Sequence, residues 1–171
     1  PDNLRFTKAE IQKYFLSMGR SLSPDELNTA QMLTNGWPIG VNAIAKSGLI
    51  DEGEGGQVLE NYIRKQIWDD SLKKFCMRTS MLNEMPVELV ERLTGEAESR
   101  QILNQLCAEN AFICHLGENK YRYHHLFQDF LRKVTHEQIP HEEVELYKVC
   151  ARYFKEQHNH LLSLHYWLKS G

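Results

Sequence analysis

The segment 121–132 is the feature that most constrains the fold, because it joins an expected β-strand to an expected helix. It follows a short apolar stretch (112–116) and a polar turn (117–120), and it opens with two tyrosines in alternate positions. This alternation after a turn predicts the return strand of a β-hairpin. Beyond His124 the apolar residues recur at helical spacing, which predicts that a helix begins there. Those apolar residues are Leu126, Phe127, Phe130, Leu131 and Val134.

His124 stands at the expected start of that helix. A helix N-terminus carries unpaired amide groups and a partial positive charge. An imidazole donor at this place can therefore contact a phosphate group. The alternative is a strand-end histidine that is satisfied by the hairpin backbone, and the local pattern alone leaves both interpretations open.

Composition excludes several classes of protein. The chain has 171 residues, enough for one compact domain or two small ones, and it is 42% hydrophobic and 25% charged, as soluble globular domains are. A net charge of −3 lacks the basic excess of a nucleic-acid-binding domain. No apolar run is long enough to span a membrane, so we expect no membrane association. The Pro1-Asp2-Asn3 start and the Ser170-Gly171 end predict a piece of a longer protein.

The four cysteines, Cys76, Cys107, Cys114 and Cys150, lie far apart in apolar contexts and form no Cys-x-x-Cys pair. Free buried cysteines behave as small hydrophobic residues, and this spacing gives no disulfide framework. No histidine lies at helical reach of Cys107 or Cys150, so nothing is expected to lower a thiol pKa for nucleophilic catalysis. We expect the reducing cytoplasm as the compartment.

The fold is predicted to be mainly α-helical, and its first unit covers residues 1–68 as four helices. Thr7 with Glu10, and Ser23 followed by Pro24, have the pattern of helix N-termini. Asn35-Gly36 predicts a helix stop, and Trp37-Pro38 opens the next helix. A glycine-rich acidic break (53–56) precedes a fourth amphipathic helix at 58–68.

The second unit, residues 69–137, is predicted to be a winged-helix domain with one β-hairpin. Three helices are expected, from Asp69/Asp70 to about residue 82, from Pro86 to Gly95, and at 96–109. The hairpin at 112–124 and a closing helix follow. Residues 138–171 form a third unit, in which two further helices resemble the start of a helical-repeat, TPR-like array.

Several segments occur together in an order that one family shares. They are Leu4-Arg5-Phe6-Thr7 with Glu10, Gly36-Trp37-Pro38-Ile39-Gly40, the run 75–82, Ile102-Leu103 with Leu106, Asn110-Ala111-Phe112-Ile113, and the block 121–131. With these residues the chain resembles the MalT-like (large LuxR-type) transcriptional activators, which belong to the STAND class of nucleotide switches. The resemblance covers essentially all 171 residues.

The resemblance implies a helical lid, a winged helix and the first helices of a sensor, which follow an upstream P-loop domain that holds ADP or ATP with Mg. Pro38 matches the position that packs on the adenine, and His124 matches the histidine that reaches the ADP β-phosphate. Gly36, Trp37 and His125 are the implied supporting residues. The motif is Tyr-His-His here, where eukaryotic relatives have Met-His-Asp, so the role of the aspartate is absent or belongs to His125.

The implied function is regulatory: the segment couples inducer sensing to the nucleotide state of the upstream domain, and so to multimerisation and transcription activation. The sequence lacks Gly-x4-Gly-Lys-Ser/Thr, so the fragment is expected to be no enzyme and to hold no cofactor, although its parent can be a slow ATPase. The expected partners are the upstream P-loop domain and the helical sensor of the same chain, with DNA contacted only through an absent C-terminal domain. Self-association of an exposed lid face is also open.

Other interpretations remain for the same residues. Pro38 can be an ordinary helix N-terminal proline, and Trp37 is expected to pack in the core of the lid. A metal site at Cys114, His115, His124 and His125 is disfavoured, because neighbours along a strand point to opposite faces.

A winged helix also suggests direct DNA binding, and a plain interaction scaffold is a further alternative. The third helix region carries Glu96, Glu98 and Glu109 against a single Arg100. Such an acidic helix would be repelled by the phosphate backbone. The modest basic patch of Lys73, Lys74 and Arg78 is interpreted as a solvated face.

Overall fold

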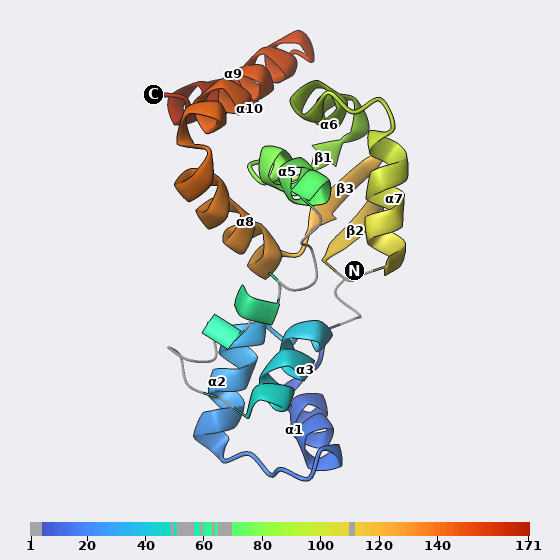
Figure 1. The fold of residues 1–171 in the computed structure, drawn as a ribbon, viewed down its shortest axis with the longest axis vertical. Coiled ribbons are helices and arrows are strands. Elements are labelled where there is room, and N and C mark those ends of the chain that lie inside the picture. The colour runs from blue at the N-terminus through green and yellow to red at the C-terminus, as the bar shows by residue number, and fades with distance from the viewer. Residues whose placement is uncertain are drawn as a thin grey trace. The chain divides into compact units, whose positions relative to one another are not determined.

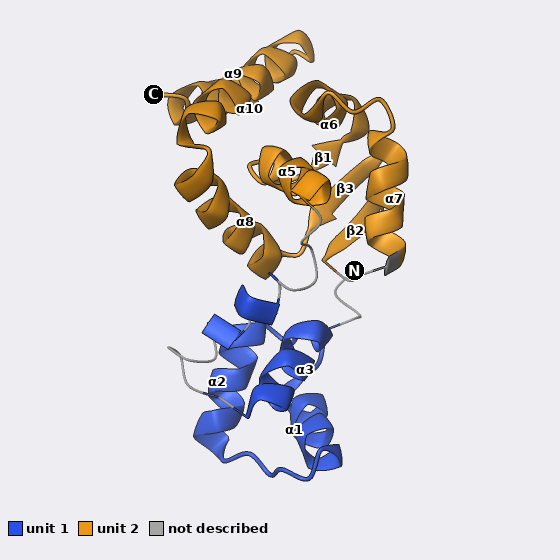
Figure 2. Cartoon of the chain, viewed as in Figure 1, with its two compact units in different colours: residues 1–68 blue, residues 69–171 orange. Residues whose placement is uncertain are grey.

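The computed structural model of the chain describes residues 5–48, 50, 57, 58, 60–62, 64, 70–109 and 112–171. It divides into two compact units, residues 1–68 and 69–171 (Figure 2). Each unit has its own core and is described by itself. Asp69, Asn110 and Ala111 of the expected motifs lie outside the described residues, as does the break expected at 53–56.

Three helices make up the well-described part of the first unit: α1 (Lys8–Ser17), α2 (Pro24–Thr34) and α3 (Pro38–Ser47). The first two begin at the predicted capping residues. The Thr7 side chain accepts a hydrogen bond from the Glu10 backbone N–H, and the Glu10 side chain returns to the Thr7 backbone. Ser23 and Glu26 form the same reciprocal pair at α2. These capping boxes satisfy backbone donors that a helix start leaves unpaired.

The core of this unit is a small apolar cluster contributed by α1, α2, α3 and the α1–α2 loop. Phe6, Tyr14, Leu27 and Leu33 are partly buried against it. The fourth helix, expected at 58–68, falls largely outside the described residues, and 58, 60–62 and 64 are helical where they are described. The fully buried members of the cluster are Ile11, Phe15, Leu22, Ala30, Val41 and Ile44.

The second unit has the element order of a winged helix, as predicted (Figure 1). Its three antiparallel strands lie in the order β1-β3-β2. The elements along the chain are α5 (Asp70–Thr79), β1 (Met85–Pro86), α6 (Val87–Thr94), α7 (Ser99–Glu109), β2 (Ile113–Gly117), β3 (Lys120–Tyr123) and α8 (His125–Gln138).

Three boundaries differ from the sequence-based expectation. β1 was not predicted, because two residues carry no alternation, and its strand character comes from Met85 pairing with Tyr121 of β3. α5 ends at Thr79 and not near residue 82, since the chain turns there with the Leu82 N–H donating to the Thr79 carbonyl. α7 begins at Ser99 and not at 96, because the Ser99 hydroxyl and backbone N–H both bond to the Glu96 carbonyl in a turn.

Two more helices, α9 (Pro140–Glu156) and α10 (His160–Lys169), pack as a pair within this unit. The Ser163 hydroxyl of α10 donates to the Ala151 carbonyl of α9 at 2.9 Å. Two arginines of the winged helix reach α9: Arg78 bonds to Glu142, and Arg92 bonds to Glu156 at 2.6 Å. None of the helices in the described part of the chain has the length and apolarity that crossing a bilayer requires.

Candidate functional site

The candidate phosphate contact lies where β3 gives way to α8. His124 is the N-cap residue of α8, with an extended backbone at φ −60° and ψ 135°. Its N–H donates to the Phe112 carbonyl at 2.7 Å, and its carbonyl accepts the first α8 hydrogen bond, from the Gln128 N–H at 2.9 Å. The predicted strand-to-helix junction at His124 is therefore confirmed.

An aromatic cluster lies directly behind this junction. The Phe127 ring packs against Phe112, with centroids 4.9 Å apart, and meets Tyr123 edge-on at 5.2 Å. The buried Tyr123 hydroxyl forms a hydrogen bond with Thr79 of α5, 2.7 Å away. Burial raises the pKa of Tyr123 well above its ordinary value. The phenol therefore remains neutral and acts as a structural hydrogen-bonding group.

The two imidazoles of the motif lie side by side. The ring centroids of His124 and His125 are 4.5 Å apart, and both residues are partly exposed, although the two ring nitrogens of His124 are buried. The first turn of α8 carries no acidic residue. Two imidazoles at a helix start without a competing carboxylate form a suitable setting for an anion.

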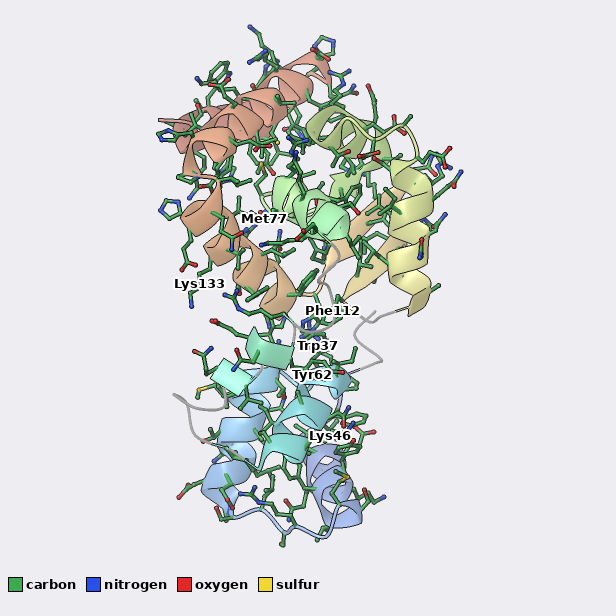
Figure 3. The ribbon with its side chains drawn as sticks, in the orientation of Figure 1. Trp37, Lys46, Tyr62, Met77, Phe112 and Lys133 are labelled. Carbon is green, nitrogen blue, oxygen red and sulfur yellow. The ribbon has the colours of Figure 1, made fainter. Side chains whose placement is uncertain are left out.

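The second candidate group belongs to the first unit. Pro38 is the first residue of α3 and is partly exposed, whereas Trp37 is its N-cap and is only 2% exposed (Figure 3). The Trp37 side chain lies against Gly40, because a Cβ built on Gly40 would come 3.2 Å from the indole ring. Trp37 is buried but is not a member of the apolar cluster described above, so its expected role in the core of the lid stays a prediction.

The structure explains why residue 36 is a glycine. Its carbonyl accepts a hydrogen bond from the Phe6 N–H at 2.7 Å, so the two backbone segments lie against each other. A Cβ at Gly36 would lie 2.3 Å from the Phe6 carbonyl oxygen, and the glycine has φ +72°. Only glycine fits this close approach without displacing the chain.

The structure brings Gly36, Trp37 and Pro38 together at the start of α3, and His124 and His125 at the start of α8. One residue that the sequence analysis missed accompanies His124. Gln128 is 7% exposed and donates to two carbonyls of the loop after α5. The available signal was a run of polar residues at helical spacing, Gln128, Arg132 and Thr135, which all bond to the same loop.

The alternative chemistries gain no support from the described residues. The Cys114 thiol donates to the Arg122 carbonyl, and the His115 ring packs on Tyr121. No group of three or more potential metal ligands occurs in the described ranges. Burial raises the pKa of both Cys76 and Cys150 to about 12, so neither thiol is activated at neutral pH.

Several charged side chains in the described part of the winged helix disfavour a nucleic-acid interface. Glu96 and Glu98 are exposed immediately before α7, the helix that would contact bases. The β2–β3 turn is tight and carries Glu118 with φ 49°. Arg122 bonds to a carboxylate, at Glu84, as the two arginines that reach α9 also do. Phosphate neutralisation needs cations that are available to the backbone.

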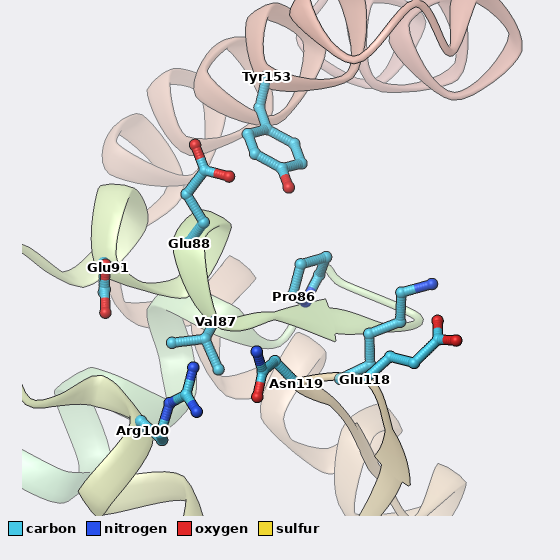
Figure 4. A pocket seen from close by; sticks show the side chains of 9 residues that line it. Pro86, Val87, Glu88, Glu91, Arg100, Glu118, Asn119 and Tyr153 are labelled. Carbon is cyan, nitrogen blue, oxygen red and sulfur yellow. The ribbon is translucent and has the colours of Figure 1, made fainter.

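A pocket of about 390 Å³ lies where the β2–β3 turn faces α6 and Tyr153 of α9 (Figure 4). Its charged side chains have both signs, and that of Glu88 already bonds to Arg92. The arrangement selects neither an anion nor a cation, so we assign no ligand to this pocket. The charged lining residues are Glu88, Glu91, Arg100, Glu118 and Lys120.

Comparisons with known proteins agree with this architecture. Residues 59–143 match the family model of the MalT winged helix domain. Three similar relatives are each named HTH-type transcriptional regulator MalT. The one from Vibrio parahaemolyticus is 25% identical over 98% of this chain, and the one from Klebsiella pneumoniae (strain ATCC 700721 / MGH 78578) is 24% identical over 98%. The one from Vibrio cholerae is 28% identical over 71%.

The chain spans only a fifth of the length of the first and second of these relatives, and 15% of the third. Fold and motif order agree with the family match. The chain is therefore MalT-like, and its residues 59–143 belong to the MalT winged helix domain family.

Proposed function

We propose that this chain is the regulatory middle segment of a transcriptional regulator. It couples inducer sensing by a helical region, which begins near residue 138, to the ADP or ATP state of an upstream P-loop domain of the STAND class. Residues 1–68 act as the lid of that nucleotide module, and 69–137 as its winged helix. DNA is contacted by a separate domain of the longer chain. The names of the relatives support the regulatory role.

The observation that carries the proposal is the position of His124. It caps α8, a helix of 14 residues whose first turn has no acidic side chain, and its ring lies beside that of His125. An N–H donor and the partial positive charge of the helix N-terminus both attract an anion. The ADP β-phosphate is the anion that this position fits in the family to which the motif belongs.

In the resting state, His124 contacts the β-phosphate and Pro38 packs on the adenine, with Mg bound in the P-loop domain. Exchange of ADP for ATP removes these contacts and releases the lid and winged helix as rigid bodies. A ligand shifts such an equilibrium only through differential contacts in the two states. The His124 and Pro38 contacts, which form only in the ADP-bound state, are the differential contacts of this switch.

ADP binding to the longer chain, which includes the P-loop domain, tests the proposal by calorimetry. We expect His124→Ala to raise the Kd for ADP about 10-fold or more, because a hydrogen bond to a charged group contributes about 1.5–3 kcal/mol. His141→Ala, which removes an exposed imidazole in the first turn of α9, should leave the Kd unchanged.

Two results would contradict the proposal in different ways. Equal ADP affinity in the wild type and the His124→Ala variant would make His124 a structural residue of the junction. Absence of ADP binding by the wild-type longer chain would favour the plain interaction scaffold. A smaller loss with Pro38→Ala is expected, since that contact is apolar and partial.

A further inference from the structure

Gln128 is a buried polar residue with an unusual pair of partners. It lies in α8, one turn beyond His124, and only 7% of its surface is exposed. Its side-chain amide nitrogen donates to the Ser80 carbonyl at 2.9 Å and to the Leu82 carbonyl at 2.7 Å. Both N–H groups of one amide are therefore used on the same short loop, which follows α5.

The two carbonyls lie beyond the end of α5, which is at Thr79. Leaving a buried carbonyl unsatisfied is costly. The Gln128 amide satisfies two of them, and Arg132 adds a hydrogen bond from Nε to the Ser80 carbonyl at 3.2 Å.

The start of α8 has no side-chain cap. His124 as N-cap makes no side-chain capping hydrogen bond, unlike Thr7 and Ser23 in the first unit. Its backbone is instead attached to the Phe112 carbonyl, and the next turn of the helix is attached through Gln128. Tertiary contacts on two sides therefore hold the start of this helix in place.

We infer that Gln128 is a positioning residue for His124: its amide ties the first turn of α8 to the Ser80 and Leu82 carbonyls and so sets where the His124 imidazole is presented. The inference rests on the proposed phosphate contact of His124. α8 is a rigid element, and a rise of 1.5 Å per residue places Gln128 about 6 Å along the axis from His124. A displacement at one is transmitted to the other.

The same loop also receives a contact from α10. The Tyr166 hydroxyl donates to the Met81 carbonyl at 3.4 Å. The loop between α5 and β1 thus lies between the helix that carries His124 and the helix pair that begins the proposed sensor. Among the α8 residues that bond to this loop, Gln128 lies closer along the helix to His124 than Arg132 and Thr135 do, so it is the most direct link from the loop to the phosphate contact.

Two substitutions separate the hydrogen bonds from the packing. Gln128→Met keeps the length and the apolar stem but removes both donors. Gln128→Glu keeps the shape, and its ionised carboxylate faces two carbonyl oxygens, which repel it. Protonation at lower pH returns one donor, so the Glu defect should shrink as pH falls, whereas the Met defect should not.

The first measurement is backbone amide exchange by NMR on the 171-residue chain. We expect Gln128→Met to speed exchange at residues 128–131 of α8 about 10-fold or more. Gln138→Met, a control at the exposed last residue of the same helix, should leave this exchange unchanged. Unchanged exchange in Gln128→Met would overturn the positioning role, whatever the nucleotide does.

The second measurement is a double-mutant cycle on ADP affinity in the longer chain with the P-loop domain. If Gln128 acts through His124, Gln128→Met raises the Kd for ADP. The double variant with His124→Ala should then bind ADP no more weakly than His124→Ala alone. Additive losses would overturn the inference while leaving the proposed function intact. If His124→Ala loses no ADP affinity, the proposed function is overturned. The amide-exchange measurement would then still test whether Gln128 holds the start of α8 in place.

Discussion

The two units of the chain are stabilised in different ways. In the first unit, α1 and α2 begin at reciprocal capping boxes made by residues three positions apart. In the second unit, buried polar contacts join residues far apart in the sequence: Thr79 with Tyr123, Ser80 with Thr135, and Gln128 with the loop after α5. Local capping sets the starts of α1 and α2, and long-range hydrogen bonds join the elements of the second unit.

This difference has a functional consequence. Pro38 stands at a helix start that its own neighbours explain, since proline suits the first position of a helix. Neither start has a side-chain cap, but the start that carries His124 is bonded to distant partners, at Phe112 and in the loop after α5. The proposed adenine contact is therefore locally built, whereas the proposed phosphate contact responds to changes elsewhere in the second unit.

The largest expected effect comes from removing one core aromatic in each unit. Phe127→Ala opens the cluster with Phe112 and Tyr123, and Phe15→Ala opens the core of the first unit. Each should lower the free energy of unfolding of its own unit by about 3–5 kcal/mol. Amide exchange, measured residue by residue, should show the loss confined to the unit that carries the substitution. Equal loss in both units would break the comparison.

A smaller effect is expected at Gly36. Gly36→Ala places a Cβ 2.3 Å from the Phe6 carbonyl oxygen at φ +72°. We expect the free energy of unfolding to fall by about 1–3 kcal/mol, through the forced shift of the chain and the strained backbone. Gly19→Ala is the matched control, because Gly19 also has positive φ but has no atom within 4 Å of the added Cβ.

Chemical denaturation of the Gly36 and Gly19 variants measures the difference between them. The control should lose about 1 kcal/mol, which is the cost of the left-handed backbone alone. Equal losses in the two variants would show that the close approach to Phe6 adds nothing.

The smallest effect concerns the capping boxes. Ser23→Ala should cost about 1 kcal/mol, the usual value of a helix N-cap. Hydrogen bonds from the Thr7 and Ser23 backbones lower the pKa of Glu10 and Glu26. A lowered folded-state pKa contributes stability above the unfolded pKa, and this contribution is lost as pH falls through the folded value.

Because Ser23→Ala keeps the backbone N–H that binds the Glu26 carboxylate, thermal melts of wild type and Glu26→Gln across the acidic range measure this contribution. The difference between the two proteins should therefore shrink as pH falls below the ordinary pKa of a glutamate. A difference that stays constant with pH would mean that the carboxylate half of the capping box contributes nothing.

The helix starts were predictable to the extent that their signals are local. Thr7 and Ser23 precede their helices with an acidic residue three positions on, and both caps form as expected. The turn at 117–120 and the junction at His124 were also predictable, because turn residues and a change in the spacing of apolar residues are signals that span only a few positions.

β1 was not predictable in the same way. The strand has only two residues, too few to show the alternation of apolar and polar side chains, and its proline disfavours a central strand. Met85 becomes a strand residue only because Tyr121 of β3 lies beside it. The end of α5 and the start of α7 were misplaced for a different reason: a local turn sets each boundary, from Leu82 to Thr79 and from Ser99 to Glu96, and the apolar period does not reveal such turns.

The sequence by itself determined the order of the elements, the helix starts of the first unit and the place of His124 at a strand-to-helix junction, because each depends on neighbours within about four residues. Only the tertiary structure decided that Gln128 lies buried against the Ser80 and Leu82 carbonyls, and that Gly36 touches Phe6. Those contacts join segments about 30 to 50 positions apart. No local pattern encodes such pairings, since they arise when hydrophobic burial brings the elements together and buried polar groups must then find partners.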